Sequence, residues 1–112
     1  SPYPTLDQAV SGTLSFAVGC GRATVATPYE YARELLAEGR GLVARDASPE
    51  ALAELLDAVL GDPEFQAALE AKAWEFGKTL TWNSVAGYYS RVADEAIMQY
   101  GLERVRGGKE QA

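Results

Sequence analysis

Hydrophobic and polar positions in the first half of the chain predict short helices that alternate with short strands. Small and apolar residues over 11–18 are typical of a short, largely buried helix, and Gly19 ends it. Residues 23–26 are apolar and β-branched, as in an internal parallel strand, and residues 41–44 form a second such stretch. The first half is therefore expected to build a small parallel sheet.

A second helix is predicted between these strands. Thr27 is expected to be its N-cap, Pro28 to take the first helical position, and Glu30 to complete a capping box. The helix is predicted to stop at Gly39. Alternation of helices and strands in this rhythm favours parallel pairing with right-handed crossovers.

The second half of the chain is predicted to be helical. Segments 48–61 and 62–77 each begin with a capping residue, proline and glutamate, and each ends at a glycine. A last helix is expected to be capped by Thr81, and the polar, Gly-rich tail 102–112 to fray. Residues 1–101 are therefore expected to form one folded portion.

Two short strands are too few for a self-sufficient α/β sheet, because its edges stay open and its apolar helices lack a surface to cover. The chain is therefore expected to be the C-terminal part of a larger α/β domain, or else to complete itself with a second copy.

Composition excludes several classes of protein. A length of 112 residues fits one domain, and a net charge of −6 argues against a nucleic-acid binder. The chain has neither an apolar run long enough for a membrane span nor a visible signal peptide. The lone Cys20 fits a reducing, cytoplasmic location and is interpreted as a small apolar residue before a turn. Without histidine or paired cysteines, neither a metal nor a cofactor is expected.

The most informative segment is Ser11-Gly12-Thr13-Leu14. It places backbone N–H groups at a predicted helix N-terminus, where a diphosphate can be held. The alternative is an ordinary strand-to-helix turn in which Gly12 allows tight packing.

Other polar and aromatic residues are given structural roles. Packing is favoured for four aromatic side chains: Tyr29, Tyr31, Trp74 and Trp82. For Tyr29 and Tyr31, which follow the strand end, the alternative is stacking against a sugar or a base. Three acidic residues are expected on a solvated helix face: Glu50, Glu54 and Asp57. No spacing recommends Asp7 or Asp46 as catalytic carboxylates.

Several motifs together resemble the retaining family 4 (group 1) glycosyltransferases. They are Ser11-Gly12-Thr13-Leu14 with Gly21, Val25-Ala26-Thr27-Pro28-Tyr29, Glu34-Leu35-Leu36, Arg40-Gly41-Leu42-Val43, Asp62-Pro63, Ala73-Trp74-Glu75-Phe76-Gly77 and Thr81-Trp82-Asn83-Ser84-Val85-Ala86. The resemblance runs from about Ser1 to Ala93 without obvious insertions.

The resemblance implies the second half of the C-terminal, Rossmann-like domain of a GT-B fold, which binds a nucleotide diphosphate sugar. By that likeness Ser11, Gly12, Thr13 and Leu14 line the donor diphosphate. Glu34 matches a glutamate of the family's turn after the strand, but it falls inside a predicted helix here and is expected to be structural.

The chain departs from the family pattern at two donor-binding positions. Most members of the family carry glutamates at the two positions that correspond to Gln8 and Phe16 of this chain. Gln8 can still hydrogen-bond the donor sugar, whereas Phe16 cannot accept from a ribose diol. The family's basic pair, which stabilises the leaving diphosphate, falls upstream of Ser1, as does the acceptor domain. This chain alone is therefore expected to be inactive, and the runner-up interpretation is a non-catalytic, self-associating α/β module.

Overall fold

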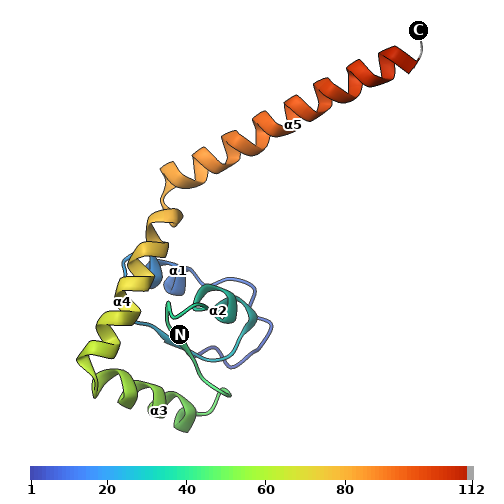
Figure 1. The fold of residues 1–112 in the computed structure, drawn as a ribbon. Helices are drawn as coiled ribbons and strands as arrows, with labels where there is room; N and C mark the ends of the chain where they lie inside the picture. Colours follow the sequence, from blue (N-terminus) through green and yellow to red (C-terminus); the bar gives the residue numbers. More distant parts are fainter. Residues whose placement is uncertain (111–112) are drawn as a thin grey trace. The chain divides into compact units, whose positions relative to one another are not determined.

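The computed structural model describes residues 1–110. The chain divides into two compact units. The first comprises Ser1–Leu80, and the second begins at Thr81. Figure 1 follows both units along the chain by colour.

The first unit is a helix-rich α/β arrangement around one pair of parallel strands. Its elements are α1 (Gly12–Gly19), β1 (Val25–Ala26), α2 (Glu30–Leu35), β2 (Leu42–Val43), α3 (Pro49–Leu60), α4 (Pro63–Gly77) and the 3-10 turn η1 (Lys78–Leu80). Val25 lies opposite Leu42 in the register, and Ala26 lies opposite Val43. The predicted parallel pairing is confirmed, although each strand is two residues long.

The helices enclose a small apolar core beside β1. Helix α4 packs against α1 and α3, α2 packs against α1, and α3 contacts β1. The core contains Leu14, Val18, Ala26, Tyr29, Ala32, Leu35, Leu36 and Ala73. Removing these side chains from water is the main favourable term that holds the short elements together.

Three helices of the first unit begin with side-chain caps. Oγ of Ser11 accepts from the N–H of Leu14 at 3.2 Å, and Oγ of Ser48 accepts from Ala51 at the same distance. Asp62 Oδ1 accepts from the N–H of Phe65 at 3.0 Å. Each cap satisfies a backbone donor that the helix itself leaves unpaired.

The predicted cap of α2 is wrong. Helix α2 begins at Glu30 after Tyr29, which makes no side-chain cap. Thr27 is buried instead, and its hydroxyl donates to the carbonyl oxygen of Tyr3 at 2.5 Å. The helix also ends at Leu35 rather than near Gly39, because the chain turns with positive φ at Glu38 and Gly39.

Helix α1 is less buried than its composition indicates. Leu14 and Val18 are its two buried residues, whereas the Phe16 side chain is 77% exposed. Cys20, interpreted as an apolar residue before the turn, is exposed at the C-cap of α1.

The second unit contains one long helix, α5 (Trp82–Glu110). Oγ1 of Thr81 accepts from the N–H of Ser84 at 3.2 Å, which confirms the predicted cap. The helix continues through Gly101, where it was expected to stop, so the predicted frayed tail is helical as far as Glu110. Glycine without positive φ stays within a helix at a cost of about 1 kcal/mol. Residues 111–112 of that tail lie outside the described residues.

Trp82 does not pack as predicted, since 89% of it is exposed.

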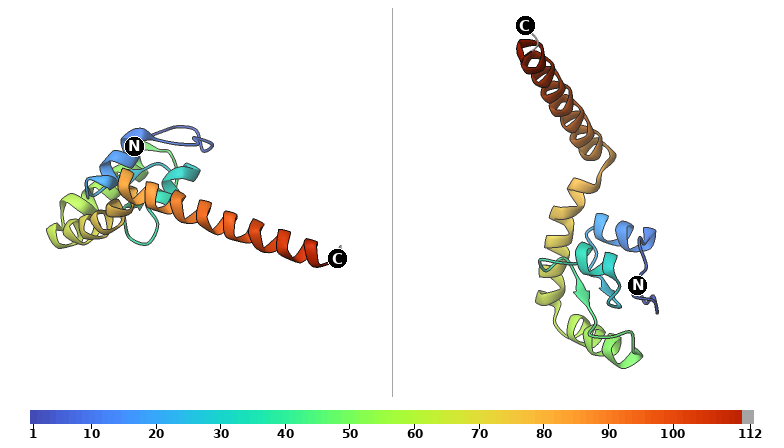
Figure 2. Two further views of the ribbon diagram at one scale, coloured as in Figure 1. Left: turned by 90° about the horizontal axis from the view of Figure 1, so that it is seen from above. Right: turned by 90° about the vertical axis from the view of Figure 1, so that its right-hand side faces the viewer.

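The two further views in Figure 2 show α5 as one uninterrupted helix. Within residues 1–110, no helix combines the length and the apolar character that a membrane span requires.

Candidate functional site

The Ser11–Leu14 segment forms the first turn of α1, as predicted. Ser11 is extended (φ −139°, ψ 109°) and 2% exposed. Its carbonyl oxygen accepts from the N–H of Ser15 at 3.0 Å and from the Ser15 hydroxyl at 2.9 Å. The helix therefore begins at a position that is fixed by both polar groups of Ser11.

Two of the backbone amides in this turn are available to a ligand. The N–H of Leu14 is bonded to Ser11 Oγ, and no group in residues 1–110 accepts from the N–H of Gly12 or Thr13. Both of these residues are exposed. The two amides, together with the positive end of the helix dipole, form an environment that favours an anion.

Gly12 has no internal packing role. A Cβ placed on Gly12 meets no described atom within 4 Å, and its φ is not positive. Neither tight packing nor backbone conformation therefore requires glycine here. A side chain at position 12 would instead obstruct the approach of another molecule to the N–H groups of this turn.

The side chains of the other predicted donor-binding residues, Leu14 and Gln8, already make contacts within the protein. Leu14 is fully buried in the core, so it contributes no side chain to a ligand. Gln8 lies three residues before Ser11, and its Nε2 donates to the carbonyl oxygen of Val10 at 2.8 Å. Its Oε1 is free of any hydrogen bond within the described residues.

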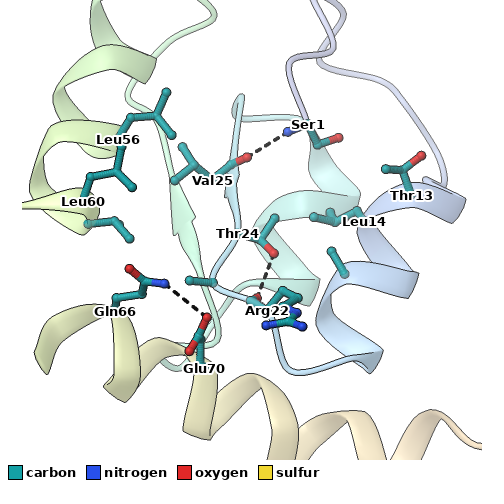
Figure 3. Close-up of a pocket in the computed structure, with 13 residues that line it drawn as sticks. Ser1, Thr13, Leu14, Arg22, Thr24, Val25, Leu56, Leu60, Gln66 and Glu70 are labelled. Atoms are coloured by element: carbon teal, nitrogen blue, oxygen red, sulfur yellow. Dashed lines mark hydrogen bonds between the residues drawn. The ribbon is translucent and has the colours of Figure 1, made fainter. Parts of the chain in front are cut away.

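A cavity of about 520 Å³ lies beside this turn. Figure 3 shows Thr13 and Leu14 of α1 on one side of it, Leu56 and Leu60 of α3 on the other, and Val25 of β1 between them. A second hollow, of about 310 Å³, is bordered by Thr13 together with Ser1, Pro2 and Tyr3. Thr13 therefore faces two open spaces.

The charges in the larger cavity come from residues that the sequence pattern does not single out. Arg22 and Glu70 line it, and the N-terminal ammonium of Ser1 donates to the carbonyl oxygen of Val25 at 2.9 Å (Figure 3). Partial burial lowers the pKa of this ammonium. Arg22 directly follows the Gly21 turn before β1, and that position is the one sequence signal that could have identified it.

Most of the other polar and aromatic residues have structural roles, as predicted. Tyr29 is fully buried, and the Tyr31 hydroxyl lies 2.5 Å from Ser15 Oγ. Trp74 is half exposed but lies against Gly21. Glu34 is exposed on α2; its backbone carbonyl accepts from Arg40 and Ala37, and no described hydrogen bond involves its carboxylate.

The acidic side chains named from the sequence lie at the surface. The predicted solvated residues are exposed: Glu50, Glu54 and Asp57. Asp7 is exposed, and Asp46 accepts from the N–H of Ser48 at 2.8 Å. Hydrogen bonding to the Ser48 side chain first, and to its N–H second, lowers the pKa of Asp46. Within residues 1–110, no cluster of three histidine, cysteine or acidic residues is placed to hold a metal.

Comparison with known proteins returned no match, either to a model of a protein family or to a curated protein.

Proposed function

We propose that this chain is the donor-binding part of a retaining glycosyltransferase of GT-B fold. In this proposal the amides at the start of α1 hold the diphosphate of a nucleotide diphosphate sugar. The observation that carries the proposal is the pair of unbonded amides at Gly12 and Thr13, with open space where a Gly12 side chain would lie. The sequence motifs that resemble this family include the same four residues.

The site would work chiefly through backbone groups. Two N–H donors at the positive end of a helix stabilise negative charge on a diphosphate without a metal ion. Gln8 can turn its amide from the Val10 carbonyl toward the sugar hydroxyls, since the loop contact that it would give up is exposed. Phe16 is solvent-exposed and offers a ribose no acceptor. Recognition of the ribose is therefore assigned to other residues of the complete protein.

Turnover is proposed only for a longer protein. Departure of a nucleoside diphosphate requires fixed positive charge beside both phosphates, and such preorganised charge is usually a large part of the rate enhancement. The turn itself carries no basic side chain. We therefore expect this chain to bind a nucleoside diphosphate weakly and to transfer no sugar by itself.

The direct test is an NMR titration of the ¹⁵N-labelled chain with UDP, GDP and ADP. Support for the proposal is a saturable shift of the Gly12 and Thr13 amide signals. Gly12→Ala is expected to weaken binding by about tenfold, equivalent to about 1.4 kcal/mol, because its methyl group lies in the path of the diphosphate.

Gly19→Ala is the matched control. It lies at the other end of the same helix, and its Cβ also meets no described atom within 4 Å. It should bind like the parent chain. If no nucleoside diphosphate moves the Gly12 and Thr13 signals at millimolar concentration, diphosphate binding is refuted. A stable dimer in the same samples would then favour the self-associating module.

A further inference from the structure

The first strand of the sheet has two edges, and only one is paired with β2. On that edge the carbonyl oxygens of Thr24 and Ala26 accept from the N–H groups of Leu42 and Ala44 at 2.9 and 2.8 Å. Backbone groups alternate in direction along a strand. The N–H and C=O of Val25 therefore point to the opposite edge.

Ser1 occupies the end of that opposite edge in the manner of a parallel strand. Its nitrogen donates to the carbonyl oxygen of Val25 at 2.9 Å, and its carbonyl oxygen accepts from the N–H of Thr27 at 3.2 Å. These two bonds flank Ala26 and reproduce the pattern of a parallel ladder. Ser1 thus lies opposite Ala26 and runs in the same direction as β1.

The rest of this edge is open and borders the 520 Å³ cavity. No described group accepts from the N–H of Val25 or donates to the carbonyl oxygen of Ala23. The side walls of the cavity are apolar: Leu14 and Ala17 of α1, and Leu56 and Leu60 of α3. Leu56 and Leu60 remain 48% and 74% exposed.

We propose that this cavity is the seat of a third parallel strand, an extended polypeptide segment that leads directly into Ser1. A parallel strand at this position pairs with the open groups of Val25 and Ala23. It lies between α1 and α3, as strands of a parallel sheet lie between helices. Because both side walls are apolar, its side chains are apolar on both faces.

This inference goes beyond the proposed function, since it concerns the sheet and holds whether or not the protein transfers sugars. When the chain is lengthened at this end, the Ser1 nitrogen becomes an uncharged amide that can make the same bond to Val25 without the cost of burying a charge.

The test is to lengthen the 112-residue chain at its N-terminus with the apolar segment Val-Val-Val-Ile-Val. Amide hydrogen exchange of Val25, followed by NMR, is the specific readout. The added strand is expected to slow that exchange by about tenfold or more and to raise the unfolding midpoint. The Ala26 amide, which bonds to β2, should be protected with and without the extension and reports that the fold is intact.

Proline scanning of the extension supplies the matched control. In a parallel ladder the second residue before Ser1 donates to Ala23, whereas the N–H of the residue immediately before Ser1 points away from β1. The carbonyl oxygen of that second residue accepts from the N–H of Val25 in the same ladder. Proline there removes the bond to Ala23 and should therefore reduce the protection of Val25, whereas proline at the first position should preserve it. Unchanged Val25 exchange in the lengthened chain overturns the proposal. So does protection that appears only in a concentration-dependent dimer, because the edge then takes a second copy.

Discussion

Gly77, the last residue of α4, lies directly against the backbone of Gly19, the last residue of α1. A Cβ on Gly77 would come within 2.7 Å of the Gly19 carbonyl oxygen and 3.1 Å of its Cα. Both neighbours are backbone atoms, so neither can move aside as the end of a flexible side chain does. This close approach allows α4 to pack against the helix that presents the candidate diphosphate turn.

Gly77→Ala is therefore expected to destabilise the protein by about 1–3 kcal/mol, although alanine favours a helix more than glycine does. Chemical denaturation of the full chain measures the change. Gly19→Ala is the matched control, because its Cβ points into open space, and it should be neutral or slightly stabilising. Equal destabilisation by both substitutions would contradict the close packing of the two helix ends.

The contact between Ser1 and Tyr29 predicts a measurable coupling energy. Ser1 Oγ lies 2.7 Å from the hydroxyl oxygen of Tyr29, which is fully buried. Tyr29→Phe should cost about 1 kcal/mol of unfolding free energy. In a double-mutant cycle with Ser1→Ala, the coupling should be about 0.5–1.5 kcal/mol.

Tyr3→Phe is the control for this cycle. The Tyr3 ring meets Tyr29 edge-on at 5.2 Å, but its hydroxyl has no partner within residues 1–110. Removing that hydroxyl should change stability little. A coupling near zero between Ser1→Ala and Tyr29→Phe would mean that the N-terminal residue is not held where the structure places it.

Acetylation of the Ser1 nitrogen is expected to stabilise the chain in a pH-dependent way. Burial lowers the pKa of this amine below its ordinary value of 8.0, so the folded state binds fewer protons than the unfolded state between the two pKa values. The stability of the unmodified chain therefore rises with pH through that window. Acetylation removes the charge but keeps the N–H that bonds to Val25.

The gain from acetylation should be largest at pH values below the lowered pKa of the folded state, and it should shrink as the pH rises above 8.0, the ordinary pKa of the amine. Thermal unfolding of both forms across this range measures it. A gain that is constant with pH would show that charge burial is not its source.

Local signals predicted much of this fold because they depend on a few adjacent residues. Ser48 and Asp62, each followed by a proline, specify a cap and a first turn without help from distant parts of the chain. The parallel pair was predictable for a similar reason, since a helix between two short apolar stretches favours a crossover. The first turn of α1 belongs with these, because Ser11 caps it through its own side chain.

The features that escaped prediction depend on distant partners. Thr27 has a suitable sequence for an N-cap, yet its hydroxyl bonds to Tyr3, which is far away along the chain. Nothing in the local sequence indicates that Ser1 pairs with β1. The extent of α5 was mispredicted from a local signal. Glycine commonly ends a helix by adopting a left-handed conformation, but Gly101 has no positive φ and α5 continues past it.

The two serine caps should differ in strength because they differ in burial. Ser11 is buried, and its hydroxyl, the cap of the Leu14 N–H, is shielded from water. Ser48 caps Ala51 at a half-buried position that water can reach more readily. Ser11→Ala should therefore cost about 1–2 kcal/mol, and Ser48→Ala about 0.5–1 kcal/mol. Urea denaturation of each variant provides the comparison, and hydrogen exchange at Leu14 and Ala51 shows which helix end has loosened. If Ser48→Ala proved the more costly change, the burial of Ser11 would not control the stability of the turn that we assign to the diphosphate.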